Sequence, residues 1–381
     1  MVCRGCSCTE TDRVLDLGRV PAADFFPLAS TPNSSEESVH PLTMALCRAC
    51  GLAQLEDDDT TAEEPRGIEP QVLRDQAAQA VRIVSEAGAL TGDTVMEFGS
   101  PHGGSWLPLL AERGLRSPPH ATRAAVVVDC FGAMHEPDQR EAFRHRAAAT
   151  ADDGVLLIQF HSLRAIVGGG QWNALRHGHF AYYSLTVLRS LLANVGMCVT
   201  AVWEFDLYGG TVLVAARHRP TGPLPADVRC MLADEQAVGL GDPVVLRSLQ
   251  RAADEQTAVL YEWLTLMARR NLRIFAYGAA SRAVPLFAKA GVDRSLVTAV
   301  ADVSHAKQTR RMPGTDVPII SPEQLVEARP DHVLLTLPEL LPEVRSRIPA
   351  LAGRWVVPPT HAVGDEFGAY RTTGVRLAAE S

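Results

Sequence analysis

The 381-residue chain contains no uninterrupted apolar run close to the roughly 20 residues that a membrane-spanning helix needs. Its first residues lack the apolar core of a signal peptide. Lysine is almost absent, since only Lys289 and Lys307 occur, and the net charge is -8. The chain therefore lacks the basic excess that drives binding to phosphate backbones. These absences predict a cytoplasmic protein whose partners include neither a membrane nor a nucleic acid.

Apolar residues are not lacking. They make up 46% of the chain, which is enough for well-packed cores and excludes a disordered protein. At about 150 residues per domain, the length predicts two or three domains.

The spacing of the eight cysteines is the most specific signal in the sequence. Two C-x-x-C pairs stand about 40 residues apart, and they are Cys3 with Cys6 and Cys47 with Cys50. Each pair can give two thiolates to one tetrahedral Zn²⁺, and Cys8 is an alternative to Cys6. A site with four sulfur ligands has no open position, so we expect a structural zinc in a small ribbon over residues 1–56. We expect Cys130, Cys198 and Cys230 to be buried core residues.

The middle of the chain opens with helical spacing over residues 71–90. A short apolar strand and a glycine-rich turn follow, and they carry Glu97, Gly99 and Gly103. A helix from Trp106 to Arg113 comes next. A strand, a glycine turn and a helix start are typical of a site for a nucleotide-like ligand, because backbone N–H groups face the turn.

Further strands predict an α/β organisation. We expect strands over Ala124–Asp129, Gly154–Phe160, Cys198–Asp206 and Gly210–Ala216, and a helix over Tyr182–Val195. Ligands in open α/β sheets bind at the carboxyl ends of the strands. Asp129 and His135 follow one such strand, and Gln159 and His161 end the next, so these residues are candidates for contact with a substrate.

A second α/β unit follows the long helical segment Asp242–Arg270. A strand over Leu272–Ala276 leads into the turn Tyr277–Arg282 and a helix that ends near Ala290. Strands are predicted over Leu296–Asp302 and Val333–Leu337. The strand–turn–helix arrangement suits an anionic ligand, so Tyr277 and Arg282 are further candidates for substrate binding.

Several motifs resemble those of sugar C-methyltransferases of antibiotic pathways. They are the paired C-x-x-C ribbon and the segments EFGSPHGG, FGAMHEP, HGHFAYYS, YGGTVLV and FAYGAASR, in the same order. The resemblance implies a zinc ribbon at 1–56, a Rossmann-like domain for S-adenosylmethionine (SAM) at 71–218 and a second Rossmann-like domain at 240–381. It also implies a nucleotide-linked keto-deoxysugar as substrate. In that family a base removes a proton beside the ketone, and the carbanion attacks the methyl group of SAM.

The chain departs from the family pattern beside the cofactor turn. Between Gly99 and Ala124 it holds one helix and a short loop, where the SAM fold has a further βαβ unit of about 30 residues. The missing strand end would supply the acid for the ribose hydroxyls. If SAM binds at all, we expect Glu97, Gly99 and Gly103 to contact it.

The catalytic loop also departs from the pattern. The family has Tyr-His-Glu-His where this chain has Arg176-His177-Gly178-His179. We expect His179 to act as the base, His177 to support it, and Tyr182 to face the same site. An imidazole can move protons near neutral pH. Arg176 can bind an oxyanion through two parallel hydrogen bonds.

Together these features predict an enzyme of secondary metabolism on a C-methyltransferase scaffold that works without SAM. Acid–base chemistry such as elimination, isomerisation or ring closure by intramolecular substitution fits a histidine-lined pocket. The expected substrate is an anionic or carrier-linked small molecule. Two alternatives stay open: a true SAM-dependent C-methyltransferase, and a non-catalytic subunit of another enzyme. We expect either a homodimer or a complex with a partner subunit.

Overall fold

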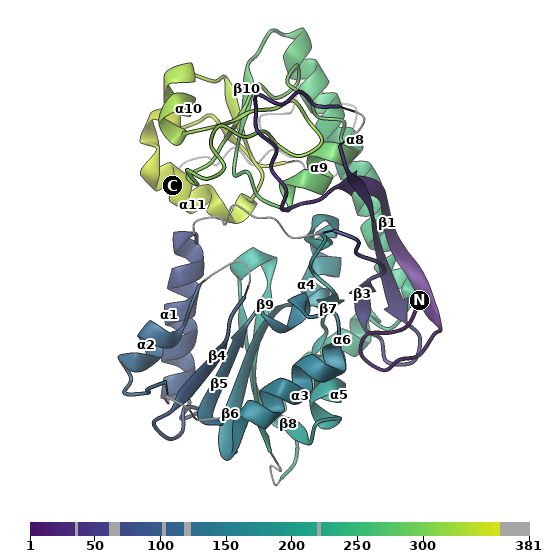
Figure 1. Cartoon of the computed structure of the whole chain (residues 1–381), viewed down its shortest axis with the longest axis vertical. Helices are drawn as coiled ribbons and strands as arrows, with labels where there is room; N and C mark the ends of the chain where they lie inside the picture. The colour runs from purple at the N-terminus through teal and green to yellow at the C-terminus, as the bar shows by residue number, and fades with distance from the viewer. Residues whose placement is uncertain (35–36, 61–68, 101–103, 118–122, 219–221, 359–381) are drawn as a thin grey trace.

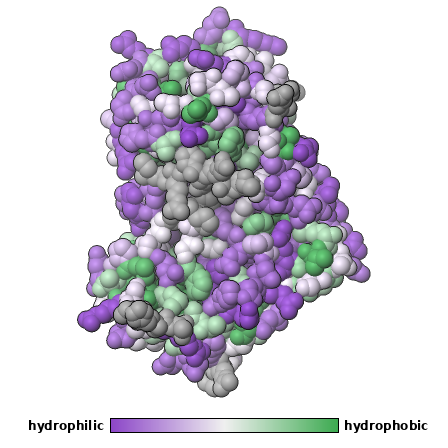
Figure 2. Space-filling model, viewed as in Figure 1, coloured by the Kyte–Doolittle hydropathy of each residue, from purple (hydrophilic) through white to green (hydrophobic). Residues whose placement is uncertain are grey.

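A computed structural model describes residues 1–34, 37–60, 69–100, 104–117, 123–218 and 222–358. Three sheets organise these residues, as Figure 1 shows. The central sheet forms the lower part of that view and the C-terminal sheet the upper part. The N-terminal strands run along one side and contact both. On the face in Figure 2 most side chains are hydrophilic, and the hydrophobic ones are scattered.

The N-terminal sheet has four strands in the order β1-β2-β3-β7. The first three are local: β1 (Thr11–Pro21), β2 (Val39–Cys47) and β3 (Ala53–Leu55). The fourth, β7 (Ala181–Tyr182), comes from the middle of the chain and pairs antiparallel with β3. We call the loop Arg176–His179 the histidine loop. The N-terminal sheet is therefore completed by the segment that follows this loop.

The central sheet has five strands in the order β4-β5-β6-β9-β8. The strands are β4 (Val95–Phe98), β5 (Ala124–Cys130), β6 (Thr150–His161), β8 (Met197–Phe205) and β9 (Thr211–His218). The first three are parallel, and β9 and β8 are antiparallel. Its helices are α1 (Gln71–Glu86), α2 (Leu107–Ala111), α3 (Gln139–Ala149), α4 (Leu163–Gly168), α5 (Leu185–Ala193) and α6 (Ala226–Val238).

The strand β4 is an edge strand in the part of the chain that the structure describes. Beyond it lies a single bridge, in which Arg116 pairs with Thr94. Between β4 and β5 the described residues contain α2 and no further strand. This arrangement agrees with the predicted shortening between Gly99 and Ala124, and it leaves the cofactor turn at the margin of the sheet.

The C-terminal sheet is parallel throughout, in the order β12-β11-β10-β13-β14. Its strands are β10 (Ile274–Tyr277), β11 (Val300–Ala301), β12 (Ile319–Ile320), β13 (His332–Leu335) and β14 (Trp355–Val356). The helices are α7 (Pro243–Leu246), α8 (Ser248–Arg269), α9 (Ala283–Lys289), α10 (Pro322–Ala328) and α11 (Leu341–Arg347). The mixed α/β class predicted from the sequence is confirmed.

One hydrophobic core joins the N-terminal sheet to the C-terminal unit. Leu15 and Met44 of the ribbon belong to the same buried cluster as Trp263 of α8 and Phe287 of α9. Figure 1 shows α8 running beside β1. The shared core fixes the N-terminal sheet against the C-terminal unit.

Two details of the predicted elements are wrong. The helix expected over Tyr182–Val195 begins only at Leu185, because Ser184 accepts a hydrogen bond from the backbone N–H of Val187 and so caps the helix there. Cys198 and Cys230 are exposed rather than buried. The predicted boundaries at 1–56, 71–218 and 240–381 stay predictions. No helix among the described residues is long and apolar enough to cross a membrane.

Candidate functional site

The four predicted zinc ligands converge at the end of the N-terminal sheet. The sulfur atoms of Cys3, Cys6, Cys47 and Cys50 all lie within 4.8 Å of one another. The Sγ–Sγ distances from Cys3 to Cys50 and from Cys6 to Cys47 are both 3.6 Å. Sulfur atoms bound to one tetrahedral zinc at about 2.3 Å would be about 3.8 Å apart, so the set fits a structural zinc. Cys8 is not part of the set, which decides between the two alternatives for the second ligand.

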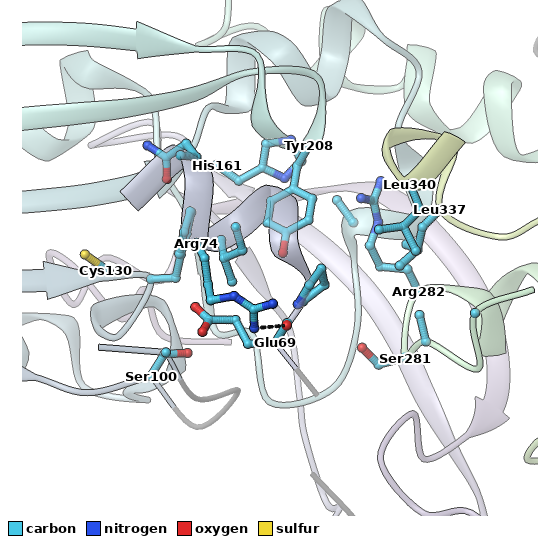
Figure 3. Close-up of a pocket in the computed structure, with 18 of the residues that line it drawn as sticks. Glu69, Arg74, Ser100, Cys130, His161, Tyr208, Ser281, Arg282, Leu337 and Leu340 are labelled. Atoms are coloured by element: carbon cyan, nitrogen blue, oxygen red, sulfur yellow. Dashed lines mark hydrogen bonds between the residues drawn. The ribbon is translucent and has the colours of Figure 1, made fainter. Parts of the chain in front are cut away.

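The second site is a cavity of about 400 Å³ between the central and C-terminal sheets, which we call the interdomain cavity. Its lining includes the start of α1, the carboxyl ends of the central strands, the histidine loop, the turn after β10 and the segment 337–347. In Figure 3, Cys130, His161 and Arg74 lie on one side of Tyr208, and Ser281 and Arg282 lie on the other.

Eight of the predicted site residues line the interdomain cavity. They are His135, Gln159, His161, Arg176, His179, Tyr182, Tyr277 and Arg282. Four others in the described part of the chain do not line it: Glu97, Gly99, Asp129 and His177. Gly103 lies outside the described residues.

His135 and His179 form an edge-to-face pair, with ring centroids 4.3 Å apart. The Nδ1 atom of His135 lies 2.8 Å from the carbonyl oxygen of Gly178. A carbonyl can only accept, so Nδ1 carries the proton, and the basic nitrogen of a neutral His135 is Nε2. In His179 it is Nε2 that is engaged, because it accepts from Nε of Arg176 at 2.7 Å. The ring better arranged to take a proton at Nε2 is therefore His135.

His177 does not share this cavity, and the prediction that it supports catalysis there is wrong in its placement. Its Nε2 lies 3.1 Å from the carbonyl oxygen of Pro41 in β2, and its ring packs edge-on against His40. Only 3% of the residue is exposed, and burial lowers the pKa of its imidazole. His177 attaches the loop to the N-terminal sheet.

Tyr182 lines the cavity, but its hydroxyl is committed to the loop. It accepts from the backbone N–H of Arg176 at 3.1 Å and donates to the carbonyl of Ala174 at 3.3 Å. Burial raises the pKa of its phenol, which keeps the hydroxyl protonated. The neighbouring Tyr183 points the other way, against Phe143 and Phe160 in the core.

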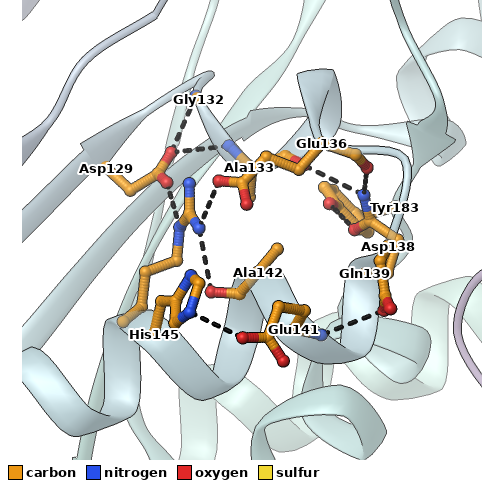
Figure 4. Close-up of polar contacts among 11 residues, drawn as sticks. Asp129, Gly132, Ala133, Glu136, Asp138, Gln139, Glu141, Ala142, His145 and Tyr183 are labelled. Carbon is orange, nitrogen blue, oxygen red and sulfur yellow. Dashed lines mark hydrogen bonds and ion pairs between the residues drawn. The ribbon is translucent and has the colours of Figure 1, made fainter.

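Asp129 is a structural carboxylate, and the prediction that it contacts the substrate is wrong. It is fully buried and pairs with Arg146 of α3. Figure 4 shows its carboxylate beside the turn that carries Gly132 and Ala133. Its Oδ1 accepts from the backbone N–H groups of Gly132 and Ala133 at 2.7 and 3.1 Å. A buried carboxylate must be paired and hydrogen-bonded, and these contacts leave neither oxygen of Asp129 available to a substrate. It holds the turn that leads to His135.

The described residues around the turn after β4 are engaged in contacts within the protein. Glu97 accepts from the hydroxyl of Ser105 at 2.5 Å and from the backbone N–H of Trp106 at 2.7 Å, so its carboxylate is committed to the start of α2. A Cβ built on Gly104 would lie 2.6 Å from Oε1 of Glu69, so the side chain of Glu69 lies directly against Gly104. On its outer side β4 has no further strand among the described residues, and on its inner side the carboxylate of Asp129 in β5 is paired with Arg146.

Tyr208 and His161 are the cavity residues with the most unusual environments. Tyr208 has a left-handed backbone with φ of 55°, which non-glycine residues rarely adopt and which is often found at functional sites. Its ring lies 6.0 Å from the guanidinium of Arg282 and 6.3 Å from the ring of His161. Burial, with Arg282 and Arg176 adding to it, lowers the pKa of His161 to about 3, so this imidazole is neutral.

The sequence analysis included His161 among its candidates but missed Tyr208, Glu69 and Arg74. The available signal for Tyr208 was the glycine pair after it, since Gly209 and Gly210 both have positive φ in a turn between two strands. Glu69 and Arg74 stand in a segment with no motif. Cys130, expected in the core, lines the cavity instead.

Comparison with known proteins fits this architecture. Residues 206–359 match the family described as the C-methyltransferase C-terminal domain, and residues 3–63 match a zinc-binding domain family. The C-methyltransferase NovU of Streptomyces niveus is 26% identical over 413 aligned residues, which cover 93% of this chain and 94% of NovU. The predicted resemblance is confirmed: the chain has a methyltransferase-type scaffold and is related to a C-methyltransferase.

Solved structures match over shorter stretches. An O-methyltransferase family protein from Burkholderia thailandensis has 15% identity and a TM-score of 0.28, covering 38% of this chain and 57% of that one. The mitomycin 7-O-methyltransferase MmcR has 17% identity and a TM-score of 0.31, covering 39% of this chain and 54% of that one. The match thus spans a little over half the length of each of these structures.

Proposed function

We propose that this protein is an acid–base enzyme of secondary metabolism that acts on an anionic small molecule in the interdomain cavity without using SAM. The reaction class is proton abstraction coupled to elimination, isomerisation or ring closure by intramolecular substitution. The observation that carries the proposal is the position of β4 at the edge of the central sheet in the described residues. Beside an edge strand there is no second strand end to hold the ribose of a SAM molecule.

The charge in the cavity supports an anionic substrate. Arg176 and Arg282 come from different domains and both line the cavity. Guanidinium groups favour carboxylate, phosphate and sulfate oxygens, and one guanidinium can bind two such oxygens through parallel hydrogen bonds. Arg282 pairs with Glu339 at 3.3 Å, while its Nε is buried and makes no hydrogen bond within the described residues. Such a donor supports contact with a ligand.

The proton-transfer groups face the same space. In the proposed step, Nε2 of His135 takes a proton from the substrate, and the negative charge that develops is stabilised by the two guanidinium groups. His179, held by Arg176, supports the ring of His135. In an isomerisation the protonated His135 then returns the proton to another atom of the substrate, so His135 ends in its starting state and no further reagent is needed. Tyr208, whose pKa is raised by burial, stays protonated and can donate a hydrogen bond to the developing negative charge.

Isothermal titration calorimetry with SAM and S-adenosylhomocysteine tests the proposal directly. We expect no binding of either compound at concentrations up to the millimolar range, with a SAM-dependent methyltransferase of known affinity as positive control. A micromolar Kd for either compound would overturn the proposal.

The alternative is a true SAM-dependent C-methyltransferase, which is favoured by the 26% identity to NovU over 93% of the chain. Incubation with methyl-labelled SAM and a panel of nucleotide-linked keto-deoxysugars separates the two. Labelled product would establish the alternative, and its absence together with absent SAM binding would remove it.

A further inference from the structure

We infer that Asp58, which follows the last local strand of the zinc-binding sheet, is a positioning residue for His135. The inference rests on the proposed function, because it gives His135 its part in proton transfer. Asp58 lies far from the histidines in the sequence and outside every motif of the chain. Its contacts nevertheless lead to Nδ1 of His135, the protonated ring nitrogen, in two hydrogen bonds.

Gly178 is the link between the two residues. Its backbone N–H donates to Oδ2 of Asp58 at 2.6 Å, and its carbonyl accepts from Nδ1 of His135 at 2.8 Å. The carboxylate of Asp58 therefore holds the N–H of Gly178, and the imidazole of His135 donates to the carbonyl of the same residue. A hydrogen bond to an ionised carboxylate is about twice as strong as a neutral one, so this anchor is a firm one.

Asp58 is itself held in place. Its Oδ1 accepts from the backbone N–H of Thr60 at 2.9 Å and from the hydroxyl of Thr60 at 2.6 Å. This arrangement directs the second oxygen, Oδ2, at Gly178. The side chain is half-buried, whereas its neighbour Asp57 is exposed.

The backbone of Gly178 needs this support. Its φ of 76° lies in the left-handed region, and an added Cβ would meet nothing within 4 Å, so packing does not hold the residue in place. The flanking contacts come from the same N-terminal sheet: His177 reaches Pro41 of β2, and β7 pairs with β3. The N-terminal sheet and the segment after it thus hold the histidine loop in place, and Asp58 is connected to His135 through Gly178 alone.

The consequence is a defined tautomer. As long as Gly178 presents its carbonyl to Nδ1, neutral His135 keeps its proton on Nδ1 and its lone pair on Nε2. When Asp58 is removed, Gly178 loses its anchor and the carbonyl no longer favours one tautomer. A loss of mere stability would leave the tautomer of the folded molecules unchanged.

The test is long-range ¹H–¹⁵N NMR of the full-length zinc-loaded protein with ¹⁵N-labelled histidine, at one fixed pH near 8. His135→Gln assigns the signals. We expect wild-type His135 to show the pattern of the Nδ1–H form. In Asp58→Ala the two nitrogen signals should move toward each other, as expected for a mixture of tautomers. Asp57→Asn removes the same charge one residue away and should leave the wild-type pattern.

Asp58→Asn removes the charge and cannot keep all the contacts. If its Oδ1 accepts from Gly178, its Nδ2 faces the backbone N–H of Thr60, and both of these groups are donors. We therefore expect its His135 pattern to move in the same direction as that of Asp58→Ala, by less. An unchanged His135 pattern in Asp58→Ala, with circular dichroism and zinc content retained, would overturn the inference. If Asp58→Ala does not fold, Asp58→Asn takes its place: a His135 pattern that moves toward a mixture of tautomers by more than in Asp57→Asn supports the inference, and one that moves no more than in Asp57→Asn overturns it.

This experiment uses neither SAM nor a substrate. Binding of SAM would therefore overturn the proposed function and leave the positioning by Asp58 standing, whereas an insensitive His135 would do the reverse.

Discussion

The buried pair of Asp129 and Arg146 allows the most quantitative prediction. The two side chains are 0% and 1% exposed, and Arg146 also reaches Glu136 at 2.6 Å and the carbonyl of Ala142 at 2.8 Å. The guanidinium stacks on the ring of Phe98, 4.5 Å from its centroid. Arg146→Met replaces a long side chain by an apolar one of similar length and leaves the carboxylate of Asp129 without its counter-charge.

Removing one partner of a buried ion pair costs about 3–5 kcal/mol, because the remaining charge stays in a poorly polarisable environment. Two backbone N–H groups still donate to Asp129, so we expect the lower half of that range, about 3–4 kcal/mol. Hydrogen exchange followed by mass spectrometry on peptides of β5 measures the free energy of opening where the pair lies.

A second substitution separates the charge from the packing. Both backbone N–H groups donate to Oδ1 of Asp129, and Arg146 pairs with Oδ2. Asp129→Asn can therefore keep the two backbone contacts while it removes the charge. We expect the double variant Asp129→Asn with Arg146→Met to be more stable than Arg146→Met alone.

The matched control is Arg144→Met, two residues earlier on α3. Arg144 pairs with Glu141 on the surface, where its side chain is 67% exposed, so the same substitution should change the opening of β5 very little. The reasoning is refuted if Arg146→Met behaves like this control, or if the double variant is no more stable than Arg146→Met.

Three further predictions concern the metal, the histidines and pH. Cys47→Ser should lower zinc from about one ion per chain and loosen the N-terminal sheet, as measured by metal analysis and proteolysis; full zinc occupancy would contradict the ligand set. Once a substrate is known, His135→Gln and His179→Ala should each lower kcat by about 10²–10⁴-fold, and His177→Ala by less; equal losses would contradict the placement of His177. His161 has a pKa of about 3 in the folded protein and 6.5 in an unfolded chain, so between these values the unfolded state binds more protons. The free energy of unfolding should therefore fall as pH drops from 6.5 to about 3, and in His161→Gln its dependence on pH, measured by urea titrations, should be weaker. An unchanged pH dependence in His161→Gln would show that His161 titrates normally.

The parts of this architecture that could be predicted from sequence depend on short-range patterns. Four cysteines in two fixed spacings define the metal site, because a tetrahedral ion accepts few arrangements of ligands. The strand at Ala124–Cys130 centres on three consecutive valines, Val126–Val128, and apolar runs rich in β-branched residues form buried strands. These signals are complete within a few neighbouring residues.

The parts that could not be predicted depend on partners far along the chain. Tyr182 lies in a two-residue strand whose partner, β3, precedes it by more than 120 residues, and two residues carry no periodicity. Asp129 ends a strand, as a ligand-binding acid would, and its role is decided by Arg146, which stands 17 residues later on a helix. Neither the pairing of β7 with β3 nor that of Asp129 with Arg146 can be predicted from composition or from residue spacing.

The histidine site survives beside a shortened cofactor region because it is held by other parts of the molecule. The missing unit lies beyond β4, on the outer edge of the central sheet, while the strands next to the histidines are β5 and β6 in the interior of that sheet. The histidine loop is attached to the N-terminal part of the chain through β7, Pro41 and Asp58. The guanidinium of Arg176 also donates to the hydroxyl of Ser281 in the C-terminal unit at 2.6 Å. None of these contacts passes through residues between Gly99 and Ala124. These contacts position the histidine loop independently of the described residues between Gly99 and Ala124, so the proposed acid–base site does not depend on a complete cofactor region.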